Sequence, residues 1–358
     1  MKKRKKKTNN NKKIIIFLGI VLVIAAIIGT LIFFGNKSLD KNDNDGKANE
    51  PDIELNVDQP KTLKIVDVDS KSRPYAVMIN NISTARPYHS GLQEAMIVYE
   101  MIVEGGITRM MAVYKDANVD RIGSVRSSRH YFLDYALEND AIYVHIGWSP
   151  QAKSDMSALG VNNINGLYDS AFYRDKSLKI SKEHTSFTDT GRINKLISKK
   201  GYRTTTNRDL LLNYSAEDLD LSTMQGTIAA NNISIKYSGS AKTEYKYDPV
   251  SKSYLRSVNG VAHKDYVTGK QYTAKNIITY QVGNTKISSD KKNRQDLDNL
   301  GKGTGYFISN GYAVPITWEK TSRDSQTVYR YNNGEEIKVN DGNTFIQIQP
   351  KSQELIIN

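Results

Sequence analysis

Three arginines and a histidine crowd one short segment, RIGSVRSSRHYFLD, residues 121–134. Arg121, Arg126 and Arg129 lie within nine positions, and the pattern after them predicts an amphipathic helix with a serine N-cap. The first turn of a helix leaves backbone N–H groups without partners and carries partial positive charge. Arginines there favour a phosphate, sulfate or carboxylate, because one guanidinium can donate to two oxygens. The segment therefore predicts an anion-binding site.

The residues expected to bind the anion come from this segment and one neighbouring strand. They are Arg109, Arg121, Arg126, Ser127, Ser128, Arg129 and His130. A carboxylate of the protein could satisfy the same arginines instead. The available ones are Glu100, Glu104, Asp134 and Asp140. Both interpretations stay open, and they overlap, because an internal carboxylate can also orient an arginine that binds a ligand.

Histidines and carboxylates raise the alternative of catalysis. The candidate catalytic residues are Glu100, Glu104, His145 and His184, with His130 as a further base. A histidine would act as general base while the arginines stabilise developing negative charge. The two glutamates are on the order of 13 Å apart along one strand, which is long for a pair sharing one reacting group. Whether the chain is an enzyme stays open, and a non-catalytic role is favoured.

Metal and cofactor motifs are not found in the sequence. No two histidines have the His-Glu-x-x-His spacing of a helical zinc site. Cysteine is absent, which excludes disulfides, thiolate ligands and a cysteine nucleophile. The glycine-containing segments GGITRM, GKGTGYF and GWS lack the phosphate-loop and nucleophile-elbow patterns. No metal and no cofactor are therefore predicted.

A predicted β-hairpin must position the carboxylates. AMIVYEMIVE and TRMMAVYKD flank Gly105-Gly106 and have the composition of two strands. A two-residue loop at these glycines would place Ile102 opposite Arg109. Strand alternation then puts both glutamates on the face that carries this arginine.

Composition divides the chain into five segments. Residues 1–13 are a basic head, 14–34 an uncharged apolar run, and 35–72 a polar linker without aromatic residues. Residues 73–225 mix strand and helix patterns and predict an α/β domain. Residues 226–358 carry short strand patterns separated by Asn-Gly turns and predict an antiparallel all-β domain. The expected fold class is thus α+β with one N-terminal transmembrane helix.

The apolar run and the charge distribution limit where the protein can be located and which partners it can have. Residues 14–34 are long enough to cross a hydrocarbon core of about 30 Å as a signal anchor. The basic head would stay in the cytoplasm, so both domains would lie outside the cell. The chain would then be a single-pass protein of the bacterial cell membrane. Of the 50 Lys+Arg, eight lie in residues 1–13, which leaves 42 against 38 Asp+Glu. The nearly balanced charge of residues 14–358 argues against nucleic-acid binding. The partners that remain are the membrane, an anionic wall polymer, a lipid head group or an envelope protein.

The order of the motifs resembles the YerB-like family of Gram-positive envelope proteins, built on domain of unknown function 3048. The resemblance is carried by RPYAVMINNISTARPYHSGLQEAMIVYE and RIGSVRSSRHYFLDYALENDAIYVHIGW, and later by GTGYFISNGYAVPITWEK. It covers about residues 73–350 and implies an α/β N-terminal domain and a β-rich C-terminal domain. The family is described as lipoproteins without an assigned reaction. Because this chain has no cysteine to lipidate, the apolar run is the expected anchor.

Together these features predict a membrane-anchored extracytoplasmic protein that binds an anionic envelope ligand through the arginine-rich helix start. An envelope hydrolase or transferase with a His/Glu/Arg cleft is one alternative. A non-catalytic scaffold for an envelope protein is the other.

Overall fold

The computed structural model describes residues 62–288 and 290–358 of the chain. Two large β-sheets, two small ones and three α-helices account for the regular structure in this part. The described residues form one compact unit, and it holds both regions that composition separates.

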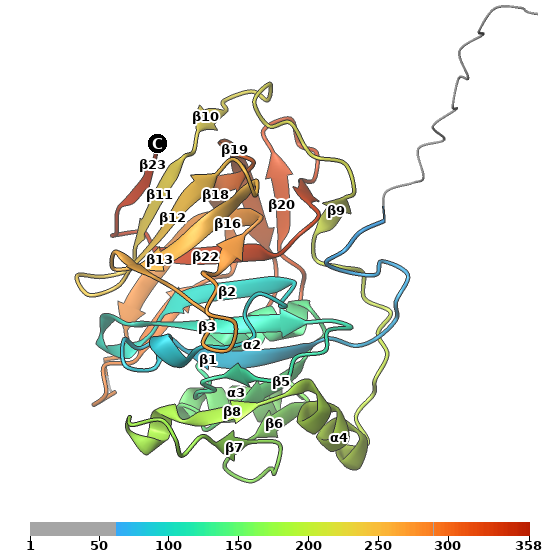
Figure 1. Ribbon diagram of the computed structural model, residues 1–358, viewed down its shortest axis with the longest axis vertical. Coiled ribbons are helices and arrows are strands. Elements are labelled where there is room, and N and C mark those ends of the chain that lie inside the picture. The colour runs from blue at the N-terminus through green and yellow to red at the C-terminus, as the bar shows by residue number, and fades with distance from the viewer. Residues whose placement is uncertain (1–61, 289) are drawn as a thin grey trace, which may run out of the picture. The chain divides into compact units, whose positions relative to one another are not determined.

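The larger sheet has twelve strands and takes them from both halves of the chain. The first half contributes β1 (Tyr75–Asn80), β2 (Ile97–Ile102), β3 (Thr108–Tyr114), β5 (Ile142–His145) and β6 (Asn163–Asn165). The second half contributes β10 (Ile228–Ala229), β16 (Asn276–Lys286), β17 (Gln295–Asp298), β18 (Gly301–Ser309), β19 (Tyr312–Lys320), β20 (Val328–Tyr331) and β22 (Thr344–Pro350). The halves meet where β22 runs parallel to β2, with Ile97 opposite Thr344 (Figure 1).

The second sheet has six strands, all from the C-terminal half. They are β11 (Asn232–Lys236), β12 (Lys242–Asp248), β13 (Ser253–Val258), β14 (Val261–Ala262), β15 (Thr273–Ala274) and β23 (Leu355–Ile357). The small sheets pair β9 (Asn213–Ser215) with β21 (Lys338–Asn340), and join β4 (Ile122–Gly123), β7 (Tyr173–Arg174) and β8 (Ser186–Thr188). The helices are α2 (His130–Glu138), α3 (Pro150–Ala158) and α4 (Thr190–Lys200). Single 3₁₀ turns span Arg86–Tyr88, Glu104–Gly106 and Lys182–His184.

Local sequence explains where these elements form. Every residue of β1, β2 and β3 is buried, and their nearly continuous apolar runs fit strands that are covered on both faces. Helix α4 begins after Asp189, whose carboxylate accepts the backbone N–H of Arg192. It ends at Gly201, which adopts the left-handed conformation with φ of 63°.

Strand β2 separates two layers of packing, because successive side chains of a strand point to opposite faces. The hydroxyl of Tyr99 donates to Glu138 of α2 at 2.6 Å. The carboxylate of the next residue, Glu100, accepts from Arg256 of β13 at 2.9 Å. Helix α2 therefore covers one face of the large sheet, and the six-stranded sheet covers the other.

The structure corrects the expected fold class. It is mostly β, with 40% strand, 13% helix and three helices in the described part, in place of an α+β arrangement. The C-terminal half is also not wholly antiparallel, because β22 runs parallel to both β16 and β2. Strand direction was not predictable from the pattern of β22, since a buried strand carries the same apolar run in either orientation.

The expected single-pass topology is likewise corrected. Within residues 62–288 and 290–358, no helix is long and apolar enough to cross a membrane. The transmembrane helix assigned to residues 14–34 and the basic head lie outside the described residues. A single-pass membrane protein is therefore not supported. Of the expected linker, residues 62–72 are described, and they contact the folded unit: the backbone N–H groups of Lys64 and Ile65 both donate to Asp341.

Candidate functional site

The hairpin of β2 and β3 is confirmed, but its register differs by one residue from the expectation. Ile102 lies opposite Thr108, not Arg109, and a 3₁₀ turn replaces the two-residue loop. A slip of one residue moves side chains to the other face of a sheet. Glu100 now shares its face with Thr108, while Arg109 points to the face covered by α2. The two glutamates consequently serve different clusters.

The first cluster joins two of the predicted arginines to one carboxylate. Glu104, in the 3₁₀ turn, accepts from Arg109 Nη2 at 3.0 Å and from Arg129 Nε at 2.8 Å, and also contacts Arg129 Nη2. Each guanidinium also donates to a main-chain oxygen. Arg109 donates to Ser127 at 2.7 Å, and Arg129 donates to Ser128 at 2.6 Å. Both arginine side chains are buried, whereas Glu104 is 24% exposed.

The electrostatics of this cluster leave an excess of positive charge. Burial alone would raise the pKa of Glu104, but the hydrogen bond from Arg129 and the charges of both arginines lower it to about 2. Burial, together with the charge of Arg129, lowers the pKa of Arg109 to about 10. At neutral pH two guanidinium groups therefore face one carboxylate, and Arg109 Nε is buried without a hydrogen-bond partner among the described residues.

The other predicted ligand residues surround this cluster with different partners. Arg126 donates to Glu183 at 2.9 Å, and both side chains are accessible, at 25% and 57%. Arg121 is bonded to Asp175 at 2.9 Å and lies over the ring of Phe187, away from the shared carboxylate. Ser128 accepts from Tyr143 at 2.9 Å and is buried.

The start of α2 differs from its predicted cap. Arg129 is the N-cap residue and makes no side-chain cap hydrogen bond, so the expected serine cap is wrong. His130 is the first helical residue, and its Nε2 lies 2.8 Å from Asp296, an exposed carboxylate on β17. The structure thus brings Arg109, Ser127, Ser128 and Arg129 together and draws His130 toward the C-terminal half.

A second cluster surrounds Glu100 and was not predicted. Its carboxylate forms an ion pair with Arg256 of β13, and both side chains are fully buried. Three further donors complete it: Thr108 at 2.7 Å, Asn81 at 2.9 Å and Thr243 at 3.1 Å. Burial alone would lower the pKa of Arg256, but the charge of Glu100 raises it. This carboxylate is committed to an ion pair across the two halves of the chain.

Two buried histidines extend that cluster. Arg256 Nε donates to His263 at 3.1 Å, and His263 Nε2 lies 2.9 Å from His89 Nδ1. The other nitrogen of His89 contacts the main-chain oxygen of Asn80. Burial lowers the pKa of His89 to about 3 and that of His263 well below its ordinary value. Both rings are neutral at physiological pH and act as hydrogen-bond links.

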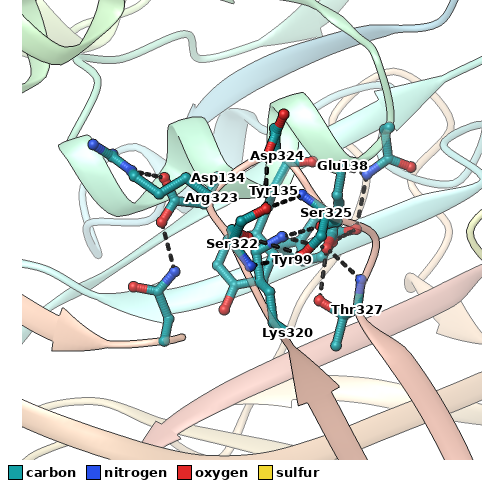
Figure 2. Close-up of polar contacts among 12 residues, drawn as sticks. Tyr99, Asp134, Tyr135, Glu138, Lys320, Ser322, Arg323, Asp324, Ser325 and Thr327 are labelled. Atoms are coloured by element: carbon teal, nitrogen blue, oxygen red, sulfur yellow. Dashed lines mark hydrogen bonds and ion pairs between the residues drawn. The ribbon is translucent and has the colours of Figure 1, made fainter. Parts of the chain in front are cut away.

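A third cluster lies at the C-terminal end of α2 (Figure 2). Glu138 is fully buried and accepts from Lys320 at 3.1 Å, from the hydroxyl of Thr327 at 2.6 Å and from Tyr99 at 2.6 Å. One turn earlier, Asp134 accepts from Arg323 at 2.6 Å. The segment that joins β19 to β20 is thereby attached to α2 by charged side chains.

The predicted catalytic histidines do not meet the predicted carboxylates. His145 bonds the main-chain oxygen of Gly147 at 2.8 Å and Asn163 at 3.3 Å, and burial lowers its pKa to about 4. His184 bonds Asn80 at 2.9 Å, and burial followed by the charge of Arg126 lowers its pKa. In the part of the chain that the structure describes, no three His, Cys, Asp or Glu side chains gather as a metal site.

The clusters that sequence reasoning missed share one property, which is long separation along the chain. Glu100 and Arg256 are 156 residues apart, and Glu138 and Lys320 are 182 apart. The sequence signal for such a cluster is a charged residue inside an apolar run. Glu100 interrupts IVYEMI, and an acid within a buried strand needs a partner from elsewhere.

Two family models match the chain over these elements. Residues 62–203 match the "Protein of unknown function (DUF3048) N-terminal domain", and residues 233–346 match the "Protein of unknown function (DUF3048) C-terminal domain". The chain belongs to the DUF3048 family, which confirms the resemblance to the YerB-like proteins. The family description assigns no molecular function.

A curated protein and a solved structure extend this match. The chain is 32% identical over 306 residues to a Bacillus subtilis (strain 168) protein described as "Putative lipoprotein YerB", over 84% of this chain and 88% of the relative. It also matches the crystal structure of YerB protein from Bacillus subtilis, with a TM-score of 0.69 and 31% identity. That match covers 80% of this chain and 94% of the solved one.

Proposed function

We propose that this chain is an extracytoplasmic, non-catalytic protein that binds an anionic envelope ligand at the start of α2. The observation that carries the proposal is the unbalanced charge of the Glu104 cluster. Two buried guanidinium groups share one carboxylate, and Arg126, whose own charge is offset by the exposed Glu183, lies at the surface close enough to act on Arg109. A ligand anion near Arg126 would offset this excess.

Arg126 is the side chain that can exchange partners. Its carboxylate partner, Glu183, is 57% exposed, and exposed ion pairs contribute about 0–1 kcal/mol. A phosphate or carboxylate of a ligand can therefore replace Glu183 at low cost. Arg109 and Arg129 stay fixed by Glu104 and contribute their positive potential without moving.

The relative's description as a lipoprotein supports the extracytoplasmic placement. Envelope ligands with the required chemistry are a phosphorylated wall polymer, a lipid head group or an acidic segment of an envelope protein. All three present oxygen anions that a guanidinium can bind in pairs.

Titration of the purified full chain with inorganic pyrophosphate tests the proposal by calorimetry. We expect saturable binding that weakens with added salt, and about tenfold weaker binding by Arg126→Ala, because one charge-assisted hydrogen bond is lost. Arg192→Ala is the matched control, since Arg192 on α4 is an exposed arginine paired with Asp189, the carboxylate that caps this helix. Equal binding by Arg126→Ala and the wild-type chain would refute the assignment.

A further inference from the structure

A pair of aromatic rings, the exposed Tyr168 and the half-buried Trp148, lies beside the Arg126 segment. Trp148, two residues before α3, and Tyr168, after β6, have ring centroids 5.9 Å apart and planes tilted by 42°. Tyr168 is 75% exposed, and Leu167 next to it is 56% exposed. Large apolar side chains that gather on a surface mark a binding site more often than single exposed ones do. We call this pair the aromatic platform.

A pocket of about 430 Å³ opens at the aromatic platform. Besides the two rings, it is lined by side chains from α3, β6, the loop after β6 and α4, including Lys153, Met156, Asn163, Asp169 and Lys200. The volume falls in the range of small-ligand sites, which combine apolar walls with a few polar groups.

The backing of the platform is rigid. The ring of His145 packs against Trp148 at 5.6 Å between centroids, and hydrogen bonds hold it from both sides. Asn165 is 2% exposed, and its Oδ1 accepts the N–H groups of Gly147 and Leu167, which ties the two loops together. A site held in this way loses little conformational entropy when a ligand binds.

The charge of the pocket is positive. Lys200 is paired with Asp169 at 3.1 Å. Lys153 lies 5.7 Å from the centre of the Trp148 ring, and its ammonium has no carboxylate partner among the described residues. One ammonium therefore remains available to an acidic group at the edge of the platform.

We propose that this pocket binds an oligosaccharide that carries acidic groups. A sugar ring presents C–H groups on its faces and hydroxyls around its rim, which matches an aromatic surface surrounded by amide and charged side chains. The ring would stack on Tyr168 and Trp148, and an acidic substituent would reach Lys153. The inference does not depend on anion binding at Arg126, because different side chains carry it.

Fluorescence titration of the full chain with tetragalacturonate, an acidic probe, tests the proposal. The chain has two tryptophans, and Trp318 is 4% exposed, so a ligand-induced change reports on Trp148. We expect saturable binding by the wild-type chain. Binding by Tyr168→Ala, measured by calorimetry, should be about tenfold weaker. Lys153→Ala should weaken binding of the acidic probe and leave binding of the neutral probe tetra-N-acetylchitotetraose unchanged. Tyr312→Ala, at a tyrosine 38% exposed on β19, should bind like wild type.

Four outcomes would overturn the proposal: no binding of the acidic probe up to about 10 mM, an unchanged affinity in Tyr168→Ala, equal affinity for neutral and acidic probes, or equal binding of a triglutamate peptide. The last outcome would show that charge alone is recognised. Arg126→Ala should leave saccharide binding intact, and Tyr168→Ala should leave pyrophosphate binding intact, so failure of either proposal is visible without the other.

Discussion

Replacement of Glu100 by glutamine should destabilise the folded protein strongly. Glutamine keeps the volume of the side chain and one acceptor oxygen for Asn81 and Thr108, which both donate to the same carboxylate oxygen. What it removes is the negative charge beside Arg256, in a pair where both side chains are fully buried. Breaking such a pair costs about 3–5 kcal/mol, because the remaining charge is buried without compensation.

Urea unfolding followed by circular dichroism measures this cost. The double variant Glu100→Gln/Arg256→Met should recover at least about 2 kcal/mol relative to Glu100→Gln, since the buried charge is then gone. Glu336→Gln is the matched control, because Glu336 pairs with Arg330 at 3.4 Å on the surface, and its loss should cost at most about 1 kcal/mol. A cost below about 1 kcal/mol for Glu100→Gln, or no recovery in the double variant, would refute the reasoning.

Three further outcomes are expected. The folded-state pKa of Glu104 is about 2, below the ordinary value of 4.5, so the Glu104 carboxylate stabilises the fold above pH 4.5 and loses this effect as pH falls toward 2. Glu104→Gln should therefore show a smaller drop in urea midpoint between pH 4.5 and 2 than the wild-type chain. The ring resonances of His145 should not titrate between pH 8 and 5 by NMR, because its pKa is lowered to about 4, and a midpoint near 6.5 would contradict its burial. Gly91→Ala should lower the free energy of unfolding by about 1–3 kcal/mol, since the φ of Gly91 is +81° and the new Cβ would lie 2.6 Å from the main-chain oxygen of Arg121. Gly239→Ala is the control, because a Cβ at Gly239 would meet open space, and it should leave the free energy of unfolding nearly unchanged in the same urea assay.

The sequence predicted the strands and the helix of the candidate site, but neither the cap of that helix nor the turn of the hairpin. The two strands of the hairpin and the helix after the arginines all form, because each follows from apolar periodicity and turn residues within one segment. Helix α4 was not predicted, although Asp189 and Gly201 provide an N-cap and a C-cap signal for it. The ligands proposed for the arginines stay predictions.

The register of the hairpin shows where local reasoning stopped. Two glycines predicted a two-residue loop, whereas the chain forms a 3₁₀ turn with Gly105 at φ 71°, which shifts the pairing by one residue. That single shift decides that Glu100 and Arg109 face opposite layers. Neither alternation nor composition carries this information, because both registers bury the same apolar residues.

By itself, the sequence determined the family, the positions of most short elements and the presence of arginines near carboxylates. Only the tertiary structure decided which carboxylate meets which arginine. Glu104 pairs with Arg129 across 25 residues, and Glu100 on the twelve-stranded sheet pairs with Arg256 on the six-stranded sheet across 156. Such pairs are selected by the requirement that every buried charge find a partner, and that requirement is met only after distant strands have packed together.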